Sequence, residues 1–205
     1  MSESRREESD AALWLEVTSG TSSSFDVIYD RYRRQVFRKA YMLTADVGDA
    51  EEVMAMVFLE AWRRRGEVRI VDGSLLPWLY ATTGMISMNV ERSKRRFKAA
   101  VQKLPAALPA PDIAIAVAET IDGLEQLSAI RDALQRLNPR ERIVVQLCLI
   151  DELPLRQAAE VLDLPIGTVK SRLHRAREKL QRLLSGRRSP AGDGNLFGEV
   201  HHEPG

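Results

Sequence analysis

Several features that define other classes of protein are scarce or absent in this 205-residue chain. Cys148 is the only cysteine, so an internal disulfide is excluded and a structural zinc site is not expected. The sequence has no Gly-rich phosphate loop and no Ser-His-Asp pattern, and no apolar run approaches the roughly 20 residues that span a bilayer. We therefore predict a protein that is not an enzyme, uses no metal or cofactor and does not enter a membrane. Its charged beginning, MSESRREESD, is unlike a secretory signal and favours a cytoplasmic location.

The chain does have a strong local imbalance of charge. Overall it is nearly neutral, with 30 Lys and Arg against 29 Asp and Glu. Between Ile166 and Arg188, however, eight Lys or Arg residues stand against one acid, Glu178. This concentration suits the phosphate backbone of DNA, although a charge run by itself is more often a solvated helix face.

The apolar spacing of the same segment predicts two helices joined by a sharp turn. One helix has a buried stripe at spacings of four, three and four: Val169, Leu173, Ala176 and Leu180. A shorter helix precedes it, with small and apolar residues on one side: Leu155, Ala158, Ala159 and Leu162. The DLP connection at residues 163–165 leaves room only for a tight turn. A helix pair, a turn and a basic face together predict a helix-turn-helix that binds DNA.

The segment GTVKSRLHRAREKL, preceded by LNPRERIVVQLCLIDELPLRQAAEVLDLP, resembles region four of the extracytoplasmic-function (ECF) group of sigma-70 family sigma factors. In that family this region binds the promoter element near minus thirty-five. The resemblance implies that Lys170, Ser171, His174 and Arg175 face bases, and that Thr168, Arg172 and Arg177 mostly contact phosphates. For His174 an exposed side chain without a partner remains an equal alternative.

The amino-terminal half resembles region two of the same family. Its segment FDVIYDRYRRQVFRKAYMLTADVGDAEEVMAMVFLEAWRRR contains two amphipathic patterns, the second beginning near Asp46 to Asp49 and burying Val53, Val57, Phe58 and Ala61. A loop with Gly66, Asp72 and Gly73 follows, and then a third helix that runs from LPWLY to ERSKRRFK. The strand-like run VRIVDG is short and falls in this loop.

The third helix and its loop are expected to capture the unpaired strand near minus ten, as the resemblance implies. Single-strand capture needs cations for phosphates and aromatic surfaces or pockets for bases. For both Trp78 and Tyr80 the alternative to a base contact is a position in the core, and this alternative is favoured for Trp78. The predicted minus-ten residues are Trp78, Tyr80, Asn89, Arg92, Arg95 and Arg96, with Lys94 as a further cation.

The resemblance also implies a surface that docks on the β′ clamp helices of RNA polymerase. It comprises Asp49, Glu51, Glu52, Ala55, Met56 and Leu59. Ala55 and Met56 replace residues that are usually Gln and an acid in the family, which leaves an exposed apolar patch. This patch indicates either an altered interface with polymerase or an inhibitor, or a tolerated change in a large surface.

The third helix departs from the family pattern as well. Thr83, Gly84, Met85 and then Asn89 stand where an ARN run and a later Asp are typical. Glycine inside a helix costs about 1 kcal/mol relative to alanine. We therefore predict that minus-ten recognition differs from the family norm or that strand opening is less efficient.

These patterns predict an all-α fold of two small helical domains joined by a flexible linker, the second domain containing the helix-turn-helix. The expected boundaries are 1–98 for the region-two-like domain, 99–126 for a linker with Pro105, Pro109 and Pro111, 127–186 for the region-four-like domain, and 187–205 for a disordered tail.

The implied function is that of an ECF sigma factor, which directs core RNA polymerase to promoters and aids initiation. Its expected partners are the β′ clamp helices and β flap of core polymerase, promoter DNA and an anti-sigma factor. The alternative is a stand-alone helix-turn-helix regulator, or a protein-interaction adaptor that uses the patch of Ala55, Met56 and Leu59.

Overall fold

The computed structural model describes residues 7–102 and 121–185, and within these ranges all regular elements are helical, as predicted. Most of the expected linker and the whole expected tail lie outside the described residues. No helix in the described ranges is both long and apolar enough to cross a membrane. In chain order the helices are α1 (Asp10–Thr18), α2 (Ser22–Thr44), α3 (Val47–Arg63), α4 (Leu76–Val101), α5 (Ile121–Gln135), α6 (Pro139–Val145), the π-helical turn η2 (Gln146–Ile150), α7 (Leu155–Leu162) and α8 (Ile166–Ser185).

The first four helices enclose one apolar core. Asp46 caps α3 by accepting a hydrogen bond from the Asp49 N–H at 2.8 Å, at the place where the acidic run predicts a helix start. The predicted inner face of α3 is buried, and so is the Val36 to Ala40 side of α2. The apolar residues that recur every three or four positions along these helices therefore form the core, as their spacing predicts.

A buried carboxylate fixes the start of α4 within this core. Asp10 accepts hydrogen bonds from the Tyr32 hydroxyl and, at 2.7 Å, from the Leu75 N–H, and it pairs with Arg31. Its side chain is only 3% exposed, so these three donors compensate for the water that the carboxylate loses. Asp10 thereby joins α1, α2 and the loop before α4.

The second half forms its own core from α5 to α8. A reciprocal capping box begins α6: the Glu141 N–H donates to Asn138 Oδ1 at 2.9 Å, and the Asn138 N–H donates to the Glu141 carboxylate at 3.3 Å. The predicted stripe of α8 is buried, as are Ala158 and Ala159 of α7. The small side chains of these alanines let α7 and α8 cross closely at the predicted turn.

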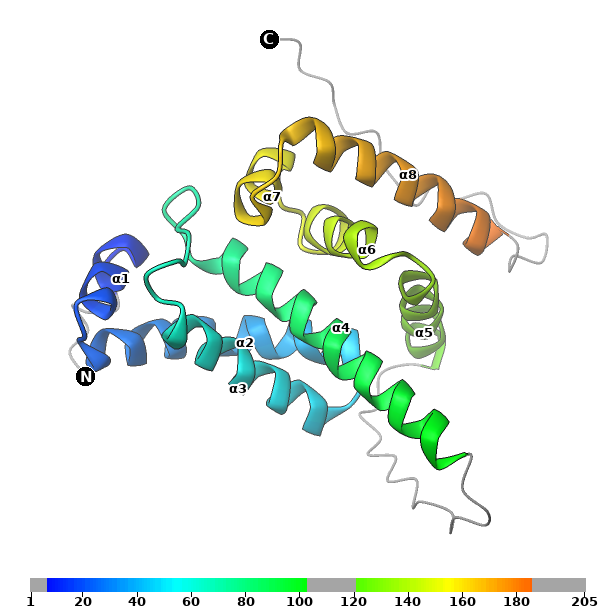
Figure 1. Ribbon diagram of the computed structural model, residues 1–205, viewed down its shortest axis with the longest axis horizontal. Helices are drawn as coiled ribbons and strands as arrows, with labels where there is room; N and C mark the ends of the chain where they lie inside the picture. Colours follow the sequence, from blue (N-terminus) through cyan, green and yellow to red (C-terminus); the bar gives the residue numbers. More distant parts are fainter. Residues whose placement is uncertain (1–6, 103–120, 186–205) are drawn as a thin grey trace.

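Helix α4 lies between the two halves (Figure 1). One side of α4 packs against α2 and α3, and another side packs against α6, η2 and α7. Leu79 is buried in the first core, whereas Ala81 is buried in the second. The two predicted domains are therefore in direct contact along α4. This contact was not anticipated from the sequence.

The loop between α3 and α4 contains a tight turn in place of a strand. Val71 and Ser74 exchange two backbone hydrogen bonds of 3.0 Å each. Between them, Asp72 and Gly73 both have positive φ, at 48° and 77°. Such backbone favours glycine, so the strand-like VRIVDG run ends in a turn at this point.

Candidate nucleic-acid interface

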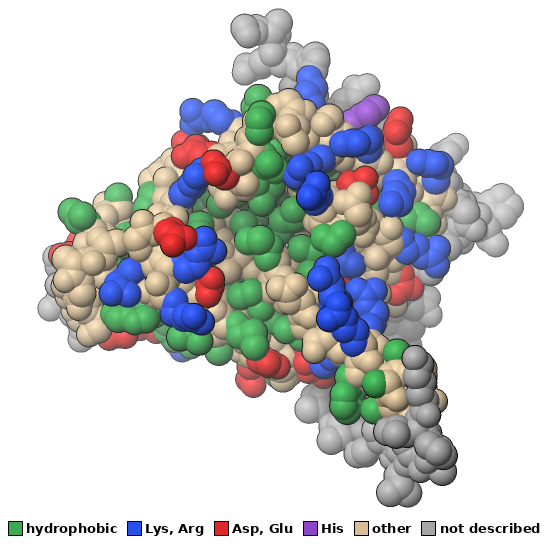
Figure 2. Space-filling model, viewed as in Figure 1, with side chains coloured by type: hydrophobic (Ala, Val, Ile, Leu, Met, Phe, Trp, Pro, Cys, Tyr) green, Lys and Arg blue, Asp and Glu red, His purple; other side chains and the backbone are tan. Residues whose placement is uncertain are grey.

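The exposed face of α8 carries the residues predicted to read bases. Lys170, Ser171, His174 and Arg175 are all exposed, on the side opposite the buried stripe. Figure 2 shows Lys and Arg side chains gathered over α8 and the later part of α4. The predicted phosphate contacts are all half-buried and lie at the edges of this face: Thr168, Arg172 and Arg177.

Contacts along α8 fix the orientation of several of these side chains. The Ser171 hydroxyl donates to the Thr168 carbonyl at 3.0 Å, and Arg175 Nε donates to the Ser171 carbonyl at 3.3 Å. His174 Nε2 lies 3.4 Å from the Glu178 carboxylate one turn further on. The His174 side chain is 74% exposed, so its role as a base contact stays a prediction.

An open hollow of about 510 Å³ separates α8 from the beginning of α6. Arg172 and Arg175 line one side, and Arg140 lines the other. Arg140 was not among the predicted residues, because nothing in the PRER run indicates which helix of the fold it faces. The Glu141 carboxylate also lines the hollow and lies 3.5 Å from the Lys179 ammonium, so the three guanidinium groups give the hollow an excess of positive charge that suits a phosphate group.

The basic end of α4 forms a second cationic surface. Arg92, Arg95 and Arg96 are exposed, and so is Asn89. Phe97 follows directly and is 73% exposed, which is unusual for a large apolar ring. Phe97 was not among the predicted residues, although an aromatic residue within a cationic run is itself a signal for base stacking.

Trp78 and Tyr80 lie apart from that surface. Trp78 is half-buried against the first core, in line with the alternative that it is a core residue. Tyr80 is half-buried beside the second core, and the Lys39 ammonium lies 4.8 Å from its ring centroid. Burial and the nearby Asp151 carboxylate raise the pKa of Tyr80. In this arrangement the structure does not bring the two aromatic residues together with the cations of α4.

The predicted polymerase-docking residues share one face of α3. Glu51, Glu52 and Ala55 are exposed, and the apolar patch continues with Met56 and Leu59, at 39% and 56% exposed. Asp49 differs from the rest: its side chain is 13% exposed and pairs with Lys94 of α4.

A buried ion pair joins the two halves near Tyr80. Lys39 of α2 donates to the Asp151 carboxylate, and the two side chains are 3% and 5% exposed. Loss of water lowers the pKa of Lys39 and raises that of Asp151, and each shift is opposed by the charge of the partner. Lys39 occupies a position in the apolar stripe of α2, three residues after Val36, and this misplaced cation was the available signal for a buried partner.

Cys148 is half-buried in η2, where it packs against the second core. Burial raises the pKa of its thiol to about 11, which keeps it protonated and unreactive at neutral pH. No group of three or more potential metal ligands occurs within residues 7–102 and 121–185.

Two helical cores with a helix-turn-helix in the second are typical of a DNA-binding protein. Comparison with known families agrees: Sigma-70 region 2 matches residues 28–96, and Sigma-70 region 4 matches residues 127–180. The chain is 30% identical over 180 residues to the ECF RNA polymerase sigma factor SigM of Mycobacterium tuberculosis, covering 88% of this chain and 87% of that one. It is 26% identical over 175 residues to the ECF RNA polymerase sigma factor SigW of Bacillus subtilis, covering 82% and 93%. The chain thus belongs to the ECF sigma factors of the sigma-70 family.

Solved structures show the same fold. CnrH, in complex with the cytosolic domain of CnrY, has a TM-score of 0.58 at 23% identity and covers 88% of this chain and all of its own. The sigma factor RpoE from Bartonella quintana, in complex with the anti-sigma factor NepR, has a TM-score of 0.51 at 19% identity, with 80% and 98% coverage. Sigma factors are transcription initiation factors, and the stand-alone regulator is not the favoured function.

Proposed function

We propose that this sigma factor reads the minus-thirty-five element with the exposed face of α8. The observation that carries this proposal is the placement of Lys170, Ser171, His174 and Arg175 opposite a fully buried stripe on one helix. Arg and Lys match guanine edges in the major groove, and Ser accepts several bases. Thr168, Arg172 and Arg177 at the edges of the face contact phosphates, together with Arg140 across the hollow.

The minus-ten strand is bound in this proposal by the basic end of α4. Arg92, Arg95 and Arg96 neutralise phosphates, Asn89 offers hydrogen bonds to a base, and the exposed ring of Phe97 offers a stacking surface. Tyr80 joins this surface only in a different arrangement of the two halves, because it is half-buried beside the second core, whereas Trp78 is half-buried against the first core in its own half.

Core polymerase docks on α3, through Asp49, Glu51, Glu52, Ala55, Met56 and Leu59. The apolar part of this face is the feature that a partner is expected to cover. Such a factor acts in the cytoplasm, and the phosphodiester chemistry belongs to the polymerase. The complexes of CnrH and RpoE with their partners support an anti-sigma factor as a further partner of this chain.

The test is transcription in vitro with purified core polymerase, this protein and a library of promoter fragments. Specific initiation is expected, and DNA binding without association with core polymerase would contradict the proposal. The promoters selected then serve to test α8: Arg175→Ala should weaken minus-thirty-five binding by about 1–3 kcal/mol and relax selection at one base. Arg182→Ala, on the same helix but nearer its end, is the matched control and should leave base selection unchanged.

A further inference from the structure

The contact between the two halves has polar groups at its centre. The Lys39 ammonium and the Asp151 carboxylate meet across it, almost without exposure to water. Removing either partner of such a pair leaves an uncompensated buried charge, so the pair specifies one arrangement of the halves. The ring of Tyr80, a predicted minus-ten residue, is held beside the same ammonium.

Gly84 permits α4 to approach the second half this closely. A Cβ at this position would lie 2.5 Å from Gln146 Oε1 and 2.7 Å from Ile143 Cδ1. The glycine that looked unfavourable for a DNA-binding helix therefore faces α6 and η2, away from the basic surface. Its departure from the family pattern has a physical reason in the contact between the halves.

The loop before α4 is held at the edge of the same contact. Arg69 donates to the Glu160 carbonyl at 2.9 Å and lies 2.9 Å from the Asp163 carboxylate in the helix-turn-helix turn. Asp72 accepts hydrogen bonds from Arg156 at 2.7 Å and Gln157 at 2.8 Å, both on α7. This loop is the segment predicted to capture the minus-ten strand, and the DNA-binding half occupies two of its side chains.

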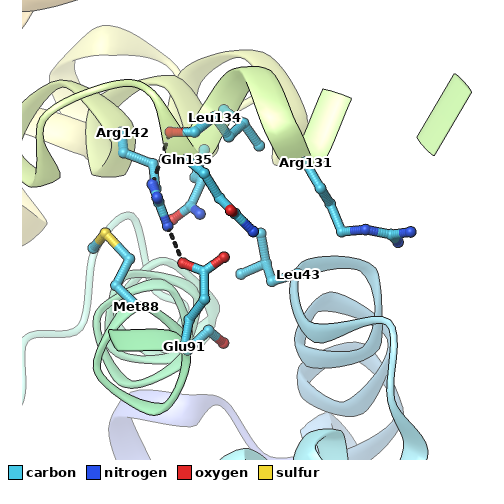
Figure 3. A pocket seen from close by; sticks show the side chains of 9 residues that line it. Leu43, Met88, Glu91, Arg131, Leu134, Gln135 and Arg142 are labelled. Carbon is cyan, nitrogen blue, oxygen red and sulfur yellow. Dashed lines mark hydrogen bonds and ion pairs between the residues drawn. The ribbon is translucent and has the colours of Figure 1, made fainter. Parts of the chain in front are cut away.

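The opposite edge of the contact is incompletely packed (Figure 3). Arg142 donates to Glu91 at 2.5 Å and to the Leu134 carbonyl at 2.9 Å beside a cavity of about 10 Å³, which is the size of one water. Ser87 Oγ and Gln146 Oε1 line this cavity and have no hydrogen-bond partner among the described residues. Buried polar atoms without partners weaken a contact, so this one is suited to separation.

We propose that the free sigma factor has a closed state, in which the region-four half holds Tyr80 and the loop before α4, and that this state competes with capture of the minus-ten strand. The competition rests on the proposed role of this loop and Tyr80 in strand capture. The closed state rests only on the contacts between the two halves. Opening frees Tyr80, Arg69 and Asp72 together, because all three are bound by the same half.

The experiment compares two opening variants of the full chain, Lys39→Ala and Gly84→Leu, with the matched control Arg34→Ala. Arg34 lies on α2, as Lys39 does, and is exposed. Small-angle X-ray scattering should show a larger radius of gyration for both opening variants and no change for the control. Circular dichroism confirms that the helices persist. Unchanged scattering in both opening variants, with the helices intact, would overturn the closed state.

The second measurement is binding of a fluorescent single-stranded oligonucleotide pool with a randomised centre, with and without core polymerase. Opening should strengthen binding by the free chain by about fivefold or more, the lower end of typical coupling between sites. Expansion without any gain in binding would refute the competition. If no form binds the pool even with core polymerase, the proposed minus-ten role fails, while the scattering result still decides the closed state.

Discussion

The Asp49 carboxylate lies 2.5 Å from the Lys94 ammonium and joins the first turn of α3 to the basic end of α4. One residue belongs to the proposed polymerase-docking face, and the other to the cationic run beside the proposed minus-ten surface. The pair therefore connects the two proposed surfaces. It lies near solvent, since Lys94 is 58% exposed.

Asp49→Asn should lower the free energy of unfolding by less than about 1 kcal/mol, because a solvent-exposed pair gains little net energy. The loss should shrink at high salt, which screens exposed charges. Urea unfolding of the variant and the wild type at low and high salt measures both effects. A salt-independent loss well above 2 kcal/mol would show that Asp49 has a structural role beyond this pair.

Met56→Lys and Leu59→Lys should each weaken binding to core polymerase by about tenfold or more. Covering a large apolar side chain contributes about 1.5–3 kcal/mol, and a lysine at the same place loses this contribution. Neither change should destabilise the protein, because both side chains are exposed on α3. Fluorescence anisotropy with labelled sigma factor measures the affinity.

The control for that experiment is Leu15→Lys on α1, where the native side chain is 73% exposed. It places the same charge on an exposed apolar position away from α3, and polymerase affinity should stay at the wild-type value. Equal losses in all three variants would indicate a non-specific effect of charge and would remove α3 as the docking face.

Local patterns in the sequence predicted the helices and their buried faces well. The stripe of Val169, Leu173 and Ala176 is buried as its spacing predicts, and the acidic start of α3 is a true cap at Asp46. Both features depend on residues within a few turns of one another, so periodicity and capping chemistry suffice.

The contact between the halves could not be predicted from sequence patterns, because the residues that form it are far apart along the chain. Lys39 and Asp151 are separated by 112 positions, and no periodicity connects them. Gly84 was interpreted from helix propensity alone, whereas its neighbours Gln146 and Ile143 explain it. The roles of the predicted base and strand contacts stay predictions, since they depend on promoter DNA and not on contacts within the chain.

Tyr32 makes the first half sensitive to high pH. Burial, followed by its hydrogen bond to Asp10, raises the pKa of its hydroxyl from 10.0 to about 12. A raised folded-state pKa means that the neutral hydroxyl stabilises the fold fully below pH 10 and that this stabilisation is lost as the pH rises towards 12. The loss should be roughly 2 kcal/mol, and Tyr32→Phe should abolish this pH-dependent step. Urea unfolding from pH 8 to pH 12 measures it, and an identical pH profile for Tyr32→Phe would contradict the assignment.

The Lys39–Asp151 pair should be replaceable by apolar side chains without loss of the contact. Burial opposes the charge of both groups, as the lowered pKa of Lys39 and the raised pKa of Asp151 indicate. Lys39→Met or Asp151→Leu alone should cost about 3–5 kcal/mol, because each leaves one buried charge unpaired. The double variant should regain that free energy and scatter X-rays as the wild type does, since no charge is left to hydrate. A double-mutant cycle of urea unfolding and scattering measures the coupling, and additive losses would mean that the two residues act independently.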